Sequence, residues 1–100
     1  MPTIAISVPH ALPPGEAAER LKTRMEDAKQ SYQGSFSDLS ERWNDHCLSY
    51  SFTVLGMQVR GTVAVEAGAV RLSADLPMAA VLFRGTIESQ LREEMERILA

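Results

Sequence analysis

The clearest pattern in the sequence is a strict alternation of apolar residues with polar or small ones. It runs from Leu48 to Val65 and is interrupted at Gly56. A period of two on both sides of a glycine is typical of two antiparallel strands joined by a tight turn. The sequence therefore predicts a β-hairpin whose two-residue turn is Leu55-Gly56.

Shorter alternating stretches flank this hairpin. They predict a first strand over residues 3–8, a weaker second strand over 36–43 and a last strand over 70–76. Turn-forming residues separate these strands from the hairpin, at Asn44-Asp45-His46 on one side and Glu66-Ala-Gly-Ala69 on the other. The hairpin is therefore expected to be the centre of a larger antiparallel sheet.

Two further segments repeat apolar residues every three or four positions, which is typical of amphipathic helices. The first covers about 14–32 and is preceded by prolines that suit a helix start. The second follows Pro77 and covers about 78–99. Their expected apolar stripes are Ala17, Leu21, Met25, Ala28 and Tyr32 in the first, and Phe83, Ile87, Leu91, Met95 and Ile98 in the second.

The resulting order is β-α-β-β-β-β-α. It predicts an α+β fold, with one antiparallel sheet of about five strands and two helices packed on one face. One hundred residues suffice for a single hydrophobic core, so residues 1–100 are expected to form one domain.

Strand register follows from the turns. If Val54 pairs with Met57, then Tyr50 faces Gly61, and continuing the register across the next turn brings Gly61 opposite Ala74. The other expected pairs are Phe52–Val59, Leu48–Val63, Val65–Val70, Val63–Leu72, Val59–Leu76, Trp43–Leu48, Glu41–Tyr50 and Leu39–Phe52.

One row across the expected sheet therefore reads Glu41, Tyr50, Gly61 and Ala74, between rows of large apolar residues. Two interpretations stay open. A helix or the Tyr50 ring covers the glycine, which is a common arrangement in sheets. Alternatively, the row forms a small pocket in which Glu41 and Tyr50 are polar groups in an apolar wall.

The start of the last helix, Met78 to Phe83, contains six consecutive apolar residues. A run of this length covers more than one helical face. Either it is buried at the end of the sheet, or part of it contacts a second subunit, another partner or a lipid-like surface. In the second case Met78, Leu82 and Phe83 are the expected interaction surface.

Composition and charge narrow the choice of function. The chain is 45% hydrophobic and 23% charged, as in ordinary globular proteins, and its net charge of −3 argues against a nucleic-acid-binding protein. The single cysteine, Cys47, allows no intramolecular disulfide and no multi-cysteine metal site.

The sequence shows no signal peptide and no apolar run of the roughly 20 residues that a transmembrane helix requires, so a cytoplasmic location is expected.

No catalytic motif is recognisable. His46 and Cys47 are neighbours on an expected strand, where their side chains would point to opposite faces and form a poor catalytic pair. His10 lies between a strand and a helix, where a capping or loop-fixing role is expected. We therefore predict a protein that is not an enzyme, with no catalytic residue, no metal and no cofactor.

Several short motifs, taken in order, resemble one known family, the polyhydroxyalkanoic acid system proteins. The matching residues are Val8-Pro-His10-x-Leu12, Glu16-Ala17-Ala18-x-Arg20-Leu21, Trp43, Leu48-Ser-Tyr-Ser-Phe52, Gly56-x-x-x-x-Gly61-Thr-Val63, Asp75-Leu-Pro77, Phe83-x-Gly85 and Ile87. These are small bacterial proteins whose genes tend to lie near those for polyhydroxyalkanoate granule proteins. The resemblance implies an association with storage of this polyester, and it supplies no catalytic residues.

Two functions from different classes follow. The first is a non-enzymatic accessory or binding protein of the polyhydroxyalkanoate granule, which would contact the granule or its proteins. The alternative is a binding domain for a small molecule, such as an acyl or hydroxyacyl metabolite, with its pocket between the sheet and the C-terminal helix. Whether the chain forms a homodimer stays open, since a domain of this size gains from sharing an apolar surface.

Overall fold

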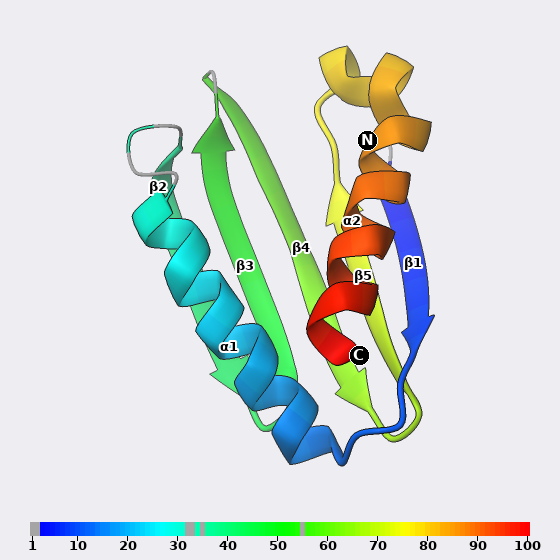
Figure 1. Cartoon of the computed structure of the whole chain (residues 1–100). Helices are drawn as coiled ribbons and strands as arrows, with labels where there is room; N and C mark the ends of the chain where they lie inside the picture. The colour runs from blue at the N-terminus through cyan, green and yellow to red at the C-terminus, as the bar shows by residue number, and fades with distance from the viewer. Residues whose placement is uncertain (1–2, 32–33, 35, 55) are drawn as a thin grey trace.

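The computed structural model describes residues 3–31, 34, 36–54 and 56–100. Within this part of the chain a five-stranded antiparallel sheet is combined with helices, which confirms the predicted α+β class (Figure 1). The elements are β1 (Thr3–Pro9), α1 (Pro14–Ser31), β2 (Ser37–Asn44), β3 (Cys47–Val54), β4 (Met57–Glu66), β5 (Ala69–Asp75), a 3₁₀ helix η1 (Met78–Phe83) and α2 (Arg84–Leu99). Tyr32, predicted in the first helical stripe, and Leu55, predicted in the hairpin turn, lie outside the described residues.

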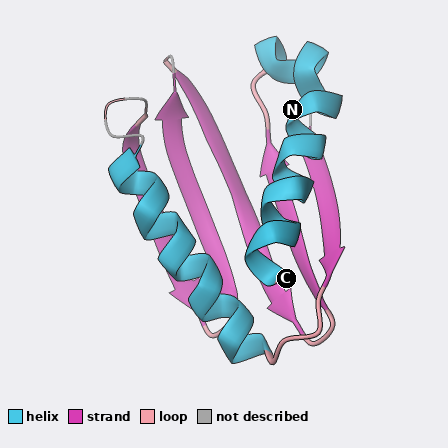
Figure 2. Ribbon diagram, in the orientation of Figure 1, coloured by secondary structure: helices cyan, strands magenta, loops and turns pink. Residues whose placement is uncertain are grey.

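The strands lie in the order β1-β5-β4-β3-β2, so the first strand of the chain pairs with the last. Both helices cover the same face of the sheet (Figure 2). The burial of β1 shows the result, because Ile4, Ile6 and Val8 on the helix side are buried while the residues between them are exposed. The opposite face of the sheet is open to solvent, which explains the alternation in the sequence.

The predicted register is confirmed along the central strands, including Tyr50 opposite Gly61 and Gly61 opposite Ala74. Two expected pairs are not part of the ladder. Leu39 and Phe52 fall at a β-bulge between Ser37 and Ser40, where Asp38 has a φ of 54°. The β4–β5 ladder ends at Arg60–Asp75, before Val59 and Leu76 would pair.

The last helical segment is broken, so the prediction of one continuous helix over 78–99 was wrong. Residues 78–83 form η1, and α2 begins only at Arg84. Phe83, the last residue of η1, has φ −105° and ψ 11°, which is outside the α-helical region, and it makes no side-chain cap for α2. Phe83 is directed away from the core and is 61% exposed, so its place in the predicted apolar stripe was also wrong.

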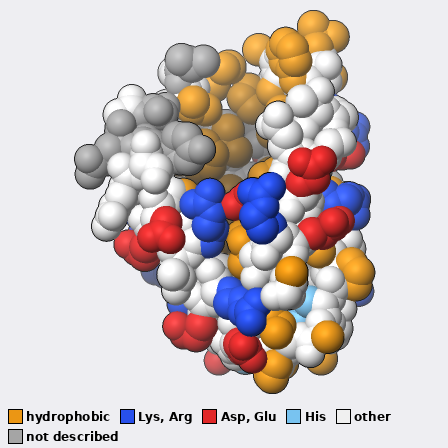
Figure 3. All heavy atoms as spheres, viewed as in Figure 1, with side chains coloured by type: hydrophobic (Ala, Val, Ile, Leu, Met, Phe, Trp, Pro, Cys, Tyr) orange, Lys and Arg blue, Asp and Glu red, His pale blue; other side chains and the backbone are white. Residues whose placement is uncertain are grey.

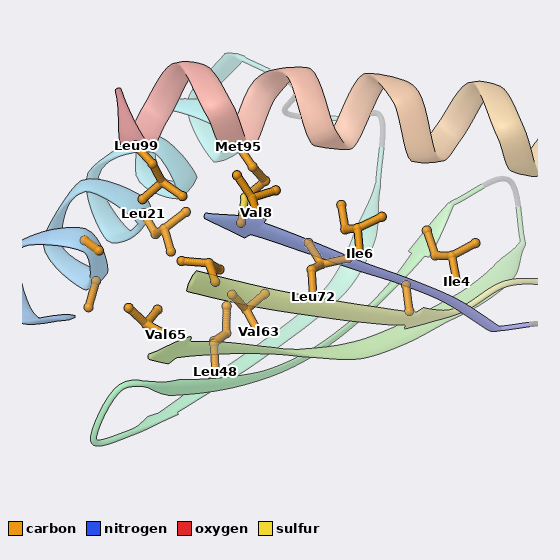
Figure 4. Packing of buried hydrophobic residues seen from close by; sticks show 14 of the residues in the cluster. Ile4, Ile6, Val8, Leu21, Leu48, Val63, Val65, Leu72, Met95 and Leu99 are labelled. Carbon is orange, nitrogen blue, oxygen red and sulfur yellow. The ribbon is translucent and has the colours of Figure 1, made fainter. Parts of the chain in front are cut away.

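The core lies between α2 and the sheet and extends to the end of the molecule where the two helices approach each other (Figure 4). Met95 and Leu99 point from α2 toward β1 and β5, and Leu21 comes from α1. At this end Arg20 of α1 donates hydrogen bonds to the backbone oxygens of Ile98 and Ala100, at 3.3 Å and 2.6 Å. From here the helices diverge toward the opposite end of the sheet (Figure 1).

His10 fixes the loop between β1 and α1. Its Nδ1 accepts a hydrogen bond from the backbone N–H of Leu12 at 3.0 Å, so the ring proton of the neutral imidazole lies on Nε2. That nitrogen donates a hydrogen bond to the backbone oxygen of Glu66, at 2.9 Å, at the end of β4. These bonds confirm the predicted loop-fixing role.

Candidate functional site

A groove of about 580 Å³ lies between the two helices, above the sheet. Its volume falls within the range of small-molecule sites in proteins. Figure 3 shows it as a hollow in which hydrophobic side chains are visible between α1 on one side and η1 and α2 on the other. The groove exists because the helices diverge, leaving part of the apolar face of the sheet uncovered.

The lining of the groove is almost entirely apolar. Aromatic side chains come from β2, β3 and the residue before β2, and aliphatic ones from the other strands and both helices. The described lining residues are Ile4, Leu21, Arg24, Met25, Ala28, Lys29, Phe36, Leu39, Trp43, Leu48, Tyr50, Phe52, Val54, Met57, Val59, Val63, Leu72, Ala74, Leu76, Pro77, Ala80, Ile87, Leu91, Glu94 and Met95. An interior of this kind favours an apolar ligand, which leaves water on entering it.

An ion pair joins the two helices across the groove. The Nε of Arg24 in α1 lies 2.6 Å from Oε1 of Glu94 in α2. The second oxygen of Glu94 accepts a hydrogen bond from Arg97, at 2.8 Å. Basic and acidic side chains lie next to each other below the hollow in Figure 3. The pair therefore joins α1 and α2, the two helices that form the walls of the groove.

A second ion pair links α1 to the edge strand β2. Lys29 contacts the carboxylates of both Glu26 and Glu41. The hydrogen bonds that the Lys29 ammonium donates to Glu26 and to Glu41, in that order of size, raise the pKa of Lys29. Lys29 is therefore charged at neutral pH, with two carboxylates beside it.

The predicted row at Gly61 is filled by the side chain of Tyr50. The Tyr50 hydroxyl donates a hydrogen bond to the backbone oxygen of Ser73, at 3.2 Å. A Cβ atom placed on Gly61 would lie 2.6 Å from this hydroxyl. Burial, with a smaller contribution from the charge of Asp75, raises the pKa of Tyr50 to about 12. The tyrosine therefore covers the glycine, which was the first of the two interpretations.

The four residues predicted for a pocket have different places. Tyr50 and Ala74 line the groove, whereas Gly61 does not, because Tyr50 lies over it. Glu41 lies at the sheet edge in its ion pair with Lys29, and its Oε2 is buried without a hydrogen-bond partner. A ligand at this row stays a prediction, and the open space lies beside the row rather than above Gly61.

Sequence reasoning missed most of the groove. Phe36, Phe52, Val54 and Met57 line its wide end, and Met25 contributes from α1. The available signal was the run of large apolar residues continuing to the tip of the β3–β4 hairpin. Local periodicity does not state which of those residues a helix will cover.

The segment η1 presents an exposed apolar surface next to the groove. Met78 is 75% exposed, Leu82 89% and Phe83 61%. Pro77 and Ala80, which lie close to them in the chain, line the groove instead. The run is therefore not buried at the sheet's end, as one interpretation held. We call Met78, Leu82 and Phe83 the η1 patch; its binding to a partner stays a prediction.

The remaining candidate residues are placed apart from the groove. Cys47 and His46 are exposed at the turn between β2 and β3. Among the described residues, no group of three or more His, Cys, Asp or Glu side chains is arranged to hold a metal ion. In the same part of the chain, no helix has the length and hydropathy needed to cross a membrane.

Comparisons with known proteins identify a family. A solved structure, that of TTHA0849 from Thermus thermophilus, is similar with a TM-score of 0.40 and 15% identity, over 98% of this chain and 92% of that one. No curated protein matches. The family model described as "Putative polyhydroxyalkanoic acid system protein (PHA_gran_rgn)" matches residues 4–99, nearly the whole chain. The chain therefore belongs to the family of polyhydroxyalkanoic acid system proteins.

Proposed function

We propose that this chain is a non-enzymatic binding protein of the polyhydroxyalkanoate system that holds an acyl or hydroxyacyl chain in the groove between α1, α2 and the sheet. One observation carries the proposal: the groove of about 580 Å³ is lined almost only by apolar side chains. Membership of the family of polyhydroxyalkanoic acid system proteins supports the choice of ligand.

The free energy of burying an apolar chain predicts how affinity should change in a series of ligands of increasing chain length. Burying one methylene group is worth about 0.8 kcal/mol, which corresponds to roughly a fourfold gain in affinity. Because the described floor of the groove is apolar, affinity should rise with chain length until the groove is filled. A ligand recognised mainly by its polar groups would not follow this trend.

The chemistry of the lining supports binding rather than catalysis. Tyr50 is the hydroxyl-bearing side chain among the described lining residues, and its hydroxyl donates a hydrogen bond to the backbone oxygen of Ser73. With its pKa raised to about 12, its phenolate is scarcely populated at neutral pH. This tyrosine is therefore poorly suited to act as a base or nucleophile.

The single tryptophan provides a direct test, because Trp43 lines the groove. Titration with methyl esters of hydroxyalkanoates of increasing chain length should change its fluorescence to saturation, with affinity rising along the series. The substitution Ala28→Phe fills the groove from α1 and should abolish the change. Gln30→Phe adds the same group at an exposed position of the same helix and should leave binding intact. A chain-length series without saturable binding would end the proposal.

A second function, contact with the granule surface, is favoured by the η1 patch. The segment from Leu76 to Phe83 carries no charged residue, and the three side chains of the patch are largely exposed. We propose that the η1 patch attaches the protein, from the cytoplasm, to the storage granule or its surface proteins. Such an apolar contact would bury surface that is otherwise exposed to water.

Granule fractionation tests this second function. Wild-type protein should sediment with granules from a producing strain, and Leu82→Glu should shift it to the soluble fraction. Gln90→Glu introduces the same charge at an exposed position of α2 and should not change the distribution. A wild-type protein found wholly in the soluble fraction would exclude granule attachment.

A further inference from the structure

We propose that the groove selects uncharged chains and rejects chains that carry a carboxylate or an ammonium group. The inference rests on the proposed function and specifies its ligand: a neutral aliphatic ester or alcohol rather than a free acid. It comes from how the charged side chains along the groove are paired.

Each cation among the described lining residues already has a carboxylate partner. Arg24 contacts Glu94 at 2.6 Å. Lys29 contacts Glu26 at 2.8 Å and also Glu41. Arg24 and Lys29 are the described cations of the lining, and Glu94 is its described anion. The described lining therefore offers no cation whose charge is left for a ligand carboxylate.

The partner of Arg24 is itself held on both oxygens. Glu94 accepts a hydrogen bond from Arg24 on Oε1 and one from Arg97 on Oε2. A ligand carboxylate at Arg24 would have to displace Glu94 from a pair that also joins the two helices. A ligand ammonium finds no free carboxylate in the described lining either, because Glu94, its described anion, is already bound by Arg24 and Arg97.

Away from these ion pairs, the floor of the groove makes the burial of a charged ligand group energetically unfavourable. The sheet contributes aliphatic and aromatic side chains such as Phe52, Val59 and Leu72, which cannot replace the water around an ion. An ionised group placed there without a partner is strongly unfavourable, whereas a hydroxyl or ester loses much less. The neutral chain therefore avoids a penalty that both charged chains meet.

Three probes of equal chain length separate these cases: decanol, decanoate and decylammonium. Each is titrated into the full-length wild-type protein, with Trp43 fluorescence and calorimetry as independent readouts. We expect decanol to bind and both charged probes to bind about tenfold or more weakly. Decanoate and decylammonium must be compared with each other. If only decanoate binds weakly, an excess of negative charge on the protein explains the result, and the pairing of charges along the groove does not.

Releasing Arg24 from its partner should reverse the selectivity. Glu94→Gln keeps a hydrogen-bond acceptor beside Arg24 but leaves the guanidinium charge uncompensated. Decanoate should then bind about tenfold more tightly than to the wild type, because charge-assisted pairs are the stronger ones. Glu93→Gln makes the same charge change at an exposed residue of α2 outside the groove and should leave the selectivity unchanged. If Glu94→Gln does not fold, the double variant Glu26→Gln/Glu41→Gln, which removes both carboxylate partners of Lys29, serves the same purpose.

The outcomes separate this inference from the function on which it rests. Binding of decanol with weak binding of both ions, and a gain for decanoate in Glu94→Gln, supports it. Decanoate binding to the wild type as tightly as decanol overturns it while leaving a chain-binding groove intact. No binding of any probe overturns the proposed function, and this inference with it.

Discussion

Gly61 occupies a point of the sheet with no room for a side chain. A Cβ there would overlap the backbone oxygen of Ser73 and lie 2.6 Å from the Tyr50 hydroxyl and 2.9 Å from Cα of Ala74. Two of these neighbours are backbone atoms, which cannot move without disturbing β5. Gly61→Ala should therefore lower the free energy of unfolding by about 1–3 kcal/mol or more, measured by urea denaturation.

Gly85 provides the matched control. It lies in the first turn of α2, where an added Cβ would meet nothing within 4 Å. Gly85→Ala should be neutral or stabilise the protein by up to about 1 kcal/mol, because alanine favours helices. Adding Tyr50→Phe to Gly61→Ala should not restore stability, since the overlap with Ser73 persists. Full rescue would show that the hydroxyl alone limits the space.

Tyr50 should give the protein an alkaline stability limit. Its pKa is about 12 in the folded state against an ordinary value of 10.0, so the folded protein favours the neutral phenol. The associated stability is present below pH 10 and is lost as the pH rises toward 12. Tyr50→Phe should remove this part of the alkaline loss, as measured by denaturation at several pH values. Equal alkaline loss in both proteins would contradict the assignment.

At the residue scale, much of this arrangement was predictable. The period of two, with turns at Gly56 and after Val65, was sufficient to place Tyr50 opposite Gly61 and Gly61 opposite Ala74. The choice between a covered glycine and a pocket was not, because it depends on the side-chain orientation of Tyr50. The Tyr50 hydroxyl is directed to a hydrogen bond with Ser73, which lies on another strand, β5. The alternation of residues within a single strand carries no information about such a contact.

At the scale of the element, η1 is the feature with the clearest consequence. Its patch is exposed, so replacing Phe83 by Glu should change the free energy of unfolding by no more than about 0.5 kcal/mol. If two copies associate through the η1 patch, light scattering will find a dimer for the wild type and a monomer for Phe83→Glu. A dimer that survives the substitution would place the subunit contact elsewhere.

The break between η1 and α2 could not be read from the helical pattern. Apolar spacings of three and four continue through Phe83 to Ile87, so periodicity alone predicts one helix. A 3₁₀ segment and an α-helix differ in the pattern of their backbone hydrogen bonds. The residues that the two helices tolerate are similar, so residue type does not distinguish them. The lack of a capping side chain at Phe83, before Arg84, is a local sign of the irregularity.

At the scale of the whole molecule, the groove is a stretch of core that the chain leaves unfilled. A ligand that binds only the folded state must stabilise it by mass action. Decanol should therefore raise the melting temperature of the wild type in a concentration-dependent way. Ala28→Phe should melt higher than the wild type without ligand, because it fills part of the groove, with a gain of about 0.5–2 kcal/mol.

The variant Ala28→Phe also provides the result that would contradict binding of decanol in the groove. If decanol raises the melting temperature of Ala28→Phe as much as that of the wild type, the ligand binds elsewhere.

The groove itself could not be predicted from the sequence, since it results from the angle between α1 and α2. Where the helices approach each other, Arg20 and Arg24 join them through contacts with Ile98 and Glu94, which are 78 and 70 positions away in the chain.

The two edges of the sheet limit how copies of this protein can assemble. The edge strand β2 is interrupted by the bulge at Asp38, and on the other edge Arg92 of α2 donates a hydrogen bond to the backbone oxygen of Ser7 in β1. A bent or covered edge is a poor template for a further strand. Growth of a continuous intermolecular sheet, the usual route to fibrils, is therefore disfavoured from both sides.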